Sequence, residues 1–234
     1  MTALSINLNK IALIRNSREG NYPNILDFAN TCIDCGVDGL TVHPRPDQRH
    51  IRAQDCFDLQ SALNVELNIE GNPFTEPHAS DQPHVGDYPG FIALVQAIRP
   101  AQVTLVPDSD QQLTSDHGFD VASDGKRLEP LIKIFKDLGC RVSLFMDPDP
   151  SAMATVASLG ADRIELYTES YARAHEVGDF ESSLAAFQET AEAAFAARLG
   201  VNAGHDLNLS NLPDFKVPHL EEVSIGHAFT VDAL

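Results

Sequence analysis

The sequence predicts a single-domain (β/α)8 barrel, and three observations support this. Short apolar runs with strand character recur at nearly even spacing, helical patterns separate most of them, and 234 residues is a usual length for one such barrel. Eight strands alternating with helices favour a closed parallel barrel over an open doubly wound sheet. The expected strands are Ser5–Asn9, Gly39–His43, Val65–Glu70, Gln102–Pro107, Arg141–Asp147, Arg163–Tyr167, Val201–Ala203 and Glu222–Gly226.

Helices are expected between most of these strands, and glycine follows several of them. Gly36, Gly139, Gly160 and Gly200 are placed as C-terminal stop signals, and Gly200 alone separates the last helix from the seventh strand. Residues 71–90 combine Pro, His and Asp, which predicts an irregular surface insertion after the third strand. The expected helices are Asn24–Cys35, Ala53–Leu63, Phe91–Ile98, Leu128–Leu138, Pro150–Leu159 and Phe180–Leu199.

The chain is strongly acidic. It has 16 Lys plus Arg against 34 Asp plus Glu, a formal net charge of −18. Such a surface repels nucleic acid and anionic lipid, so neither is expected as a partner. Any phosphate site must therefore be a local cluster of Arg, His and backbone N–H groups. The absence of a signal-peptide pattern and of any membrane-length apolar stretch predicts a cytoplasmic protein with reduced thiols.

Two groups of potential metal ligands have simpler explanations. Cys32 and Cys35 form a CxxC motif inside a helical pattern with no second pair, which favours packing over zinc or redox chemistry. His78 and His84 lie in the 71–90 segment without a Cys or carboxylate cluster at ligand spacing, which favours solvated loop residues. No metal and no cofactor are expected.

Titratable and polar residues gather where the expected strands end. In this fold the active site is built at the carboxyl ends of the strands. Burying many titratable groups together is costly unless they are paired or functional, and reactions with several proton transfers require such groups. A metal site is the less favoured alternative because no HxH, HExxH or DxD pair occurs. The residues are Asn7, Asn9, Lys10, His43, Arg45, Glu70, Thr114, Asp147, Glu165, His205, Gly226 and His227.

Two segments have the composition of phosphate sites. Thr41–Ile51 holds two Arg and two His within eight residues of an acidic protein, and Pro44 and Pro46 would stiffen it. The alternative is a turn with solvated charges. Asn202–His205 and Ser224–His227 both place a glycine before a histidine at equivalent positions of the last two strands, where a barrel commonly binds phosphate.

These residues resemble the pyridoxine 5′-phosphate synthase family, and the resemblance runs from the first strand to the eighth. The blocks that carry it occur in the family's order. They are Asn7–Arg18, Gly39–Arg45, Arg49–Ile51, Leu67–Glu70, Leu105–Pro107, Val142–Phe145, Ile164–Glu165, Val201–His205 and Ile225–His227.

The resemblance implies a ring-closing condensation without metal or cofactor. In this family 3-amino-2-oxopropyl phosphate and 1-deoxy-D-xylulose 5-phosphate give pyridoxine 5′-phosphate, phosphate and water. By position, His43 and Glu70 would be proton acceptors, His205 a proton donor, and Glu165 would stabilise a transition state. The resemblance also implies a homo-oligomer, commonly an octamer. The implied contacts are Arg45, His50 and Thr114 for the deoxyxylulose phosphate, and Asn7, Arg18, Gly226 and His227 for the amino ketone phosphate.

The chain departs from the family pattern at substrate-binding positions. The usual Asp-His pair of the first strand is Asn9-Lys10, and the usual glycine after the seventh-strand histidine is Asp206. Asp206 can still adopt left-handed backbone angles. We hypothesise that Lys10 offsets Asp206, so that the charge of the site stays near that of the family. The 71–90 insertion is also longer than the family's and is expected to be a lid or an oligomer contact.

Two other functions fit parts of this pattern. One is another phosphosugar barrel enzyme, an aldolase or isomerase, for which Lys10 is the available Schiff-base candidate. The other is a catalytically weakened barrel that binds a phosphometabolite and acts through protein partners. Turnover distinguishes an enzyme from a binding protein.

Overall fold

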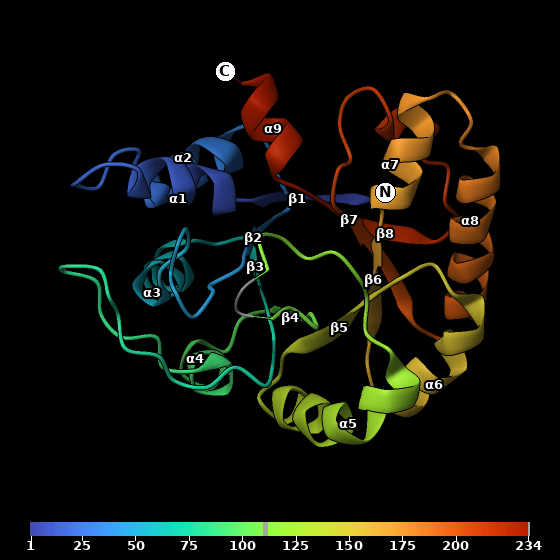
Figure 1. The fold of residues 1–234 in the computed structure, drawn as a ribbon, viewed down its shortest axis with the longest axis horizontal. Coiled ribbons are helices and arrows are strands. Elements are labelled where there is room, and N and C mark those ends of the chain that lie inside the picture. The colour runs from blue at the N-terminus through green and yellow to red at the C-terminus, as the bar shows by residue number, and fades with distance from the viewer. Residues whose placement is uncertain (110–111, 234) are drawn as a thin grey trace.

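The computed structural model describes residues 1–109 and 112–233 and has the expected closed barrel (Figure 1). Parallel strands follow one another around the barrel in chain order, and β8 pairs with β1 to close it. Each expected strand is present, with ends that differ by a few residues. The strands are β1 (Ala3–Asn7), β2 (Gly39–Val42), β3 (Glu66–Gly71), β4 (Gln102–Leu105), β5 (Arg141–Met146), β6 (Arg163–Tyr167), β7 (Gly200–Gly204) and β8 (Leu220–Ile225).

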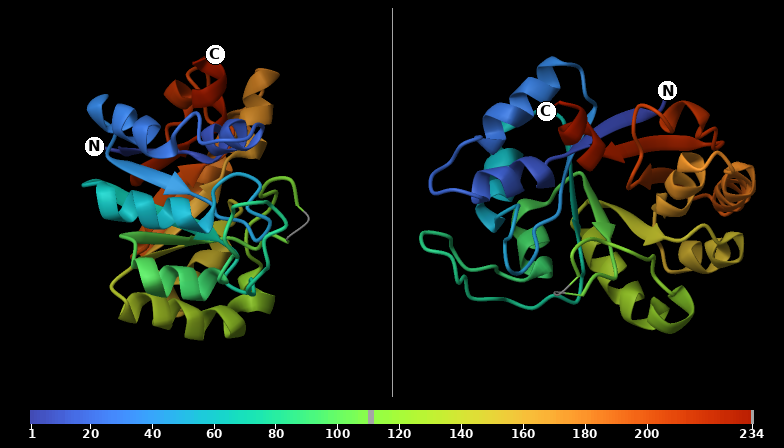
Figure 2. Two further views of the ribbon diagram at one scale, coloured as in Figure 1. Left: turned by 90° about the vertical axis from the view of Figure 1, so that its left-hand side faces the viewer. Right: turned by 45° about the horizontal axis from the view of Figure 1, so that its top comes forward.

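Helices surround the barrel (Figure 2). Expected helices lie between most of the strands, and the structure adds α1, α7 and α9, which the sequence patterns did not predict. The helices are α1 (Asn9–Asn16), α2 (Ile25–Asp34), α3 (Ala53–Ala62), α4 (Phe91–Ile98), α5 (Val121–Asp137), α6 (Met153–Ser158), α7 (Glu169–Glu176), α8 (Glu181–Ala196) and α9 (His227–Asp232), with short 3-10 turns at Pro150–Ala152 and Leu212–Asp214.

The first strand ends earlier than expected, and this moves Asn9 from a strand into a helix. β1 stops at Asn7, whose side-chain oxygen accepts a hydrogen bond from the backbone N–H of Asn9 at 3.0 Å. The chain therefore turns at Leu8 and begins α1 at Asn9. Asn9 and Lys10 consequently project from the first turn of a helix above the barrel.

Helix α5 begins earlier than expected, because Asp120 caps its first turn. The helical pattern suggested a start at Leu128, but Asp120 caps Ala122 N–H at 3.0 Å and the helix begins at Val121. Gly125 lies where a Cβ would be 3.3 Å from Leu159. Glycine weakens an isolated helix, but at position 125 it allows α5 to pack closely against Leu159.

The connection from α8 to β7 is short because Arg198 takes left-handed backbone angles, with φ of 65°. The backbone N–H groups of Arg198 and Leu199 bond back to the last turn of α8, at 2.9 Å each. The chain reverses within these residues and enters β7 at Gly200.

The interior of the barrel is polar. Alternate residues of each strand point inward, and their side chains bond across strands, as Thr104 does to Asn68 at 3.1 Å. Arg163 pairs with Glu221 at 2.6 Å and Glu222 at 3.4 Å at the amino ends of the strands. The charged groups that line a cavity of about 300 Å³ at this end include these ion pairs. A second group of buried titratable residues, which includes Glu70 and His43, lies at the opposite end.

The cysteine and histidine pairs outside the barrel differ in burial. Cys32 packs in the core, and burial raises its pKa to about 11, whereas Cys35 is exposed at the end of α2. Core packing is therefore correct for Cys32 and wrong for Cys35. His78 and His84 are exposed, as expected.

Within the described ranges, no helix is long and apolar enough to cross a membrane.

Candidate active site

A cavity of about 360 Å³ opens at the carboxyl ends of the strands. The site residues that the sequence suggested line this cavity, with the exception of Arg18 and Asp147. Those that do are Asn7, Asn9, Lys10, His43, Arg45, His50, Glu70, Thr114, Glu165, His205, Asp206, Gly226 and His227. Residues from β1, β2, β3, β6, β7 and β8 therefore meet at one mouth, as strand order requires.

The centre of the cavity is a buried pair formed by Glu70 and His43. Glu70 Oε2 lies 3.7 Å from His43 Nδ1 and accepts a hydrogen bond from Asn7 at 3.3 Å. Burial, helped by the charges of Glu165 and Asp108, raises the pKa of Glu70 well above its ordinary value. Burial, helped by Arg45, lowers the pKa of His43 well below its ordinary value. Both shifts favour the neutral form of each group, and the 3.7 Å between the two atoms is longer than a hydrogen bond.

Glu165 lies deeper in the barrel. It is 2% exposed, and a Cβ on Gly204 would overlap its carboxylate, so only glycine fits at that position of β7. Burial and the nearby Glu222 raise the pKa of Glu165 to about 8. At neutral pH it is therefore mostly a neutral carboxylic acid, able to donate a hydrogen bond into the cavity.

His205 is held in an uncommon backbone conformation at the end of β7. His205 and Asp206 both have positive φ, 80° and 55°, so Asp206 does adopt left-handed angles. The Thr168 hydroxyl bonds to the carbonyls of Gly204, at 2.6 Å, and of His205. Backbone strain persists only where surrounding contacts enforce it, and it is common at active sites.

The environment of His205 favours the neutral ring. The imidazole packs 5.0 Å from the Phe145 ring and 5.3 Å from Tyr167. Burial lowers its pKa to about 4, Arg45 and Lys10 act in the same direction, and Asp206 opposes them.

The loop after β2 presents the basic groups. Burial, helped by Arg45 and Arg49, lowers the pKa of His50 to about 3, so its ring is neutral. His50 Nδ1 accepts a hydrogen bond from Ile51 N–H at 2.9 Å, which places the ring proton on Nε2 as a donor.

Arg45 is fixed by a residue that the sequence patterns did not indicate. Asp108 is 3% exposed and accepts bonds from the Arg45 guanidinium and, at 2.8 Å, from the Ser115 hydroxyl. It also lies 3.8 Å from His43 Nε2. Its position after Pro107, in an apparent surface turn, gave no signal of burial.

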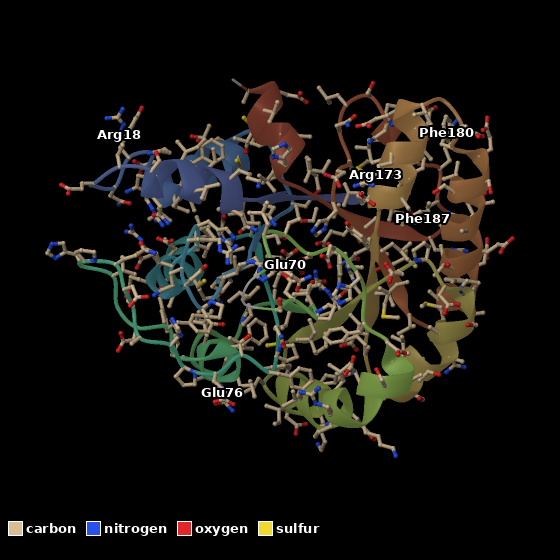
Figure 3. All side chains as sticks on the ribbon, in the orientation of Figure 1. Arg18, Glu70, Glu76, Arg173, Phe180 and Phe187 are labelled. Carbon is tan, nitrogen blue, oxygen red and sulfur yellow. The ribbon has the colours of Figure 1, made fainter. Side chains whose placement is uncertain are left out.

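Arg18 does not reach the cavity. It is exposed beyond the end of α1 and lies far from Glu70 in Figure 3. Arg15, three residues earlier, turns inward instead and pairs with Asp55 at 2.6 Å. The implied contact of Arg18 with the amino ketone phosphate therefore has no counterpart within the single chain.

The fold and site define a (β/α)8-barrel enzyme with an acid–base cluster at the carboxyl ends of its strands. The chain belongs to the family described as pyridoxal phosphate biosynthesis protein PdxJ, whose model matches residues 4–234.

Named relatives agree with this assignment, and a solved structure agrees with the fold. The chain is 57% identical to the pyridoxine 5′-phosphate synthase of Xanthomonas campestris pv. campestris (strain B100), over 100% of this chain and 90% of that protein. It is 52% identical to the enzyme of that name from Xylella fastidiosa (strain 9a5c), over 100% and 89%. Phosphoribosyl anthranilate isomerase from Thermus thermophilus superposes with a TM-score of 0.53 at 13% identity, covering 96% of this chain and 87% of that one, a likeness of fold alone.

Proposed function

We propose that the chain is a pyridoxine 5′-phosphate synthase of vitamin B6 biosynthesis. It condenses 3-amino-2-oxopropyl phosphate with 1-deoxy-D-xylulose 5-phosphate, giving pyridoxine 5′-phosphate, phosphate and two molecules of water. The family and the relatives' names support this reaction. The observation that carries it is the buried Glu70–His43 pair, in one cavity with two groups of phosphate-compatible residues.

Each substrate has its own part of the cavity in this proposal. The deoxyxylulose phosphate binds to Arg45, His50 and Thr114, because the His50 Nε2 proton and the Arg45 guanidinium suit phosphate oxygens. The amino ketone phosphate binds beside Asn7, Gly226 and His227. A Cβ on Gly226 would lie 2.9 Å from that of Asn7, so glycine allows β8 and β1 to approach here.

The chemistry is a series of proton transfers between bound substrates. Imine formation takes protons from the amine and gives them to the leaving water. Phosphate elimination needs a base at the adjacent C–H bond. We assign acceptance to Glu70 and His43, donation to His205, and stabilisation of developing charge to Glu165. Holding both substrates in register supplies a further part of the rate.

Substrate charge prepares the proton donor. A histidine with a pKa of about 4 is almost entirely in its neutral form at neutral pH, so few molecules hold the proton to be donated. Phosphate dianions beside the ring favour its charged form and raise that pKa. In this proposal the binding of the anionic substrates favours protonation of His205, which links proton donation to a filled site.

An assay with both substrates tests the function. Product is followed by absorbance while released phosphate is measured in parallel. Product and phosphate forming together support the synthase. Substrate binding without product would favour the catalytically weakened barrel, and would direct attention to Asn9, Lys10 and Asp206.

The same proposal includes the setting of the enzyme. We place it in the cytoplasm as a homo-oligomer, an octamer by family resemblance. Light scattering on the purified protein measures the number of subunits.

Lys10→Ala is expected to weaken binding of the phosphorylated substrates by about 10-fold, because a charged donor is lost from the cavity. Lys10 and Asp206 shift the pKa of His205 in opposite directions, which is what the offset hypothesis requires. The His205 pKa should therefore rise in the variant. Calorimetry and a histidine NMR titration measure the two effects.

The matched control is Lys126→Ala, which removes an exposed lysine on α5. It should change neither quantity. Unaltered binding of both substrates to Lys10→Ala would refute the offset hypothesis.

A further inference from the structure

The β3–α4 segment, residues 72–90, contacts the loops after β2 and β4, which carry the groups proposed for the deoxyxylulose phosphate. At its start, the Asn72 side chain donates to the Asp108 carbonyl at 2.7 Å, in the loop that leads to Thr114. At its tip, the Gln82 side chain donates to the carbonyls of Asp47, at 3.0 Å, and Gln48, at 3.2 Å. We infer that Gln82 is a positioning residue that braces the phosphate-binding loop after β2. The inference rests on the proposed function.

The contact at the tip is reciprocal. The Gln48 side chain reaches back and donates to the Gly86 carbonyl at 2.7 Å, while its oxygen accepts from Ala53 N–H at 2.9 Å. Gln48 is 1% exposed although its side chain is polar. A buried amide with both ends bonded fixes the two segments relative to each other and to the start of α3.

The tip that presents Gln82 is itself ordered by local bonds. His78 and Tyr88 exchange backbone hydrogen bonds of 2.9 and 2.8 Å, and Tyr88 is buried. Ser80 N–H bonds to the Asp87 carboxylate at 3.0 Å, and Gln82 N–H bonds to the Ser80 hydroxyl at 3.2 Å. The Gln82 side chain therefore starts from a defined position.

The braced loop needs support, because Gln48 has a φ of 50°, an uncommon value for a residue other than glycine. Asn16 supports the inner side of the loop by donating to the carbonyls of Gln48, Arg49 and His50, the last at 2.8 Å. Gln82 supports the outer side. Arg45 and His50 flank this stretch, so their geometry toward a phosphate depends on it.

Loss of the outer support should affect one substrate more than the other. Arg45 and His50 are the groups proposed for the deoxyxylulose phosphate, whereas the amino ketone phosphate binds on the β8 side. Gln82→Ala is therefore expected to raise KM for the deoxyxylulose phosphate by about 2- to 10-fold, the usual effect of one or two hydrogen bonds. The KM for the amino ketone phosphate and kcat should stay within about 2-fold of wild type.

The test compares Gln82→Ala with Gln96→Ala, which truncates an exposed glutamine on α4. Steady-state kinetics are measured for each substrate in turn. Hydrogen exchange of residues 47–51 is measured in both variants without substrates. We expect faster exchange and the selective rise in KM in Gln82→Ala alone.

The two readouts separate the brace from the proposed function. Unchanged exchange would overturn the brace, and faster exchange with an unchanged KM for the deoxyxylulose phosphate would overturn its positioning role. Equal rises in both KM values would also overturn it. Absence of product from the wild type would refute the proposed function instead, and the brace would then be judged by exchange and by the affinity of inorganic phosphate.

Discussion

Glu70→Gln is expected to reduce kcat by about 10³-fold, because general acid–base groups typically contribute 10²- to 10⁴-fold. Glutamine has the shape of the protonated carboxylic acid and can still accept the bond from Asn7. Its amide can neither take up nor release a proton in the reaction. Formation of pyridoxine 5′-phosphate and release of phosphate should fall together, while both substrates still bind. Stopped assays for both products and calorimetry for binding provide the measurements.

Glu76→Gln is the matched control. This substitution makes the same change of charge and shape at an exposed residue of the β3–α4 segment. Glu76 lies at the edge of the molecule in Figure 3, whereas Glu70 is central. Its kcat should equal that of the wild type. Turnover by Glu70→Gln within about tenfold of the wild type would remove Glu70 from the proposed role.

The positions of the strand-end residues could be predicted because two regular features fix them. Side chains alternate along a strand, and all parallel strands of a closed barrel end at the same face. Once Val65–Glu70 was recognised as a strand, Glu70 had to lie at that face, and the same reasoning placed Glu165. Small errors in strand ends do not alter this result.

Residues whose role depends on the path of a loop could not be predicted in this way. Asp108 lies three residues beyond β4, and only the folded loop brings it to Arg45 and His43. The Arg45–Asp108 pair could not be predicted, because the two residues are far apart in the sequence. No periodic pattern shows which residue of a loop will meet the end of an earlier strand. The inward turn of Arg15 rather than Arg18 has the same cause, since it depends on where α1 ends.

The role of the 71–90 segment was only partly accessible. Its Pro, His and Asp residues predicted an irregular connection, and the structure has only an isolated bridge between His78 and Tyr88 there. The sequence suggested a lid or an oligomer contact. Both of these roles stay predictions. The hydrogen bonds of Gln82 and Gln48 add a brace, and glutamine in a polar loop carries no sequence signal of such pairing.

Burial of Glu165 should make the stability of the enzyme depend on pH. Its pKa is about 8 in the folded protein against an ordinary value of 4.5. Below pH 4.5 the folded and unfolded chains both hold the proton, and burial of the acid carries no ionisation cost. Between pH 4.5 and about 8 only the folded chain holds it, so the free energy of unfolding falls by about 1.4 kcal/mol per pH unit and levels off above that range.

Glu165→Gln should remove this dependence, because glutamine matches the protonated acid and does not titrate. Relative to the wild type, the variant should gain about 3 kcal/mol in free energy of unfolding between pH 5.5 and 8.5, while it loses the proposed stabilisation of the transition state. Urea unfolding at both pH values measures the gain. The exposed Glu129→Gln on α5 is the control and should follow the wild type. If Glu165→Gln also followed the wild type within about 1 kcal/mol, Glu165 would be ionised in the folded protein. The group at the base of the cavity would then be an anion that repels both phosphates, rather than a neutral acid that can donate to a substrate oxygen.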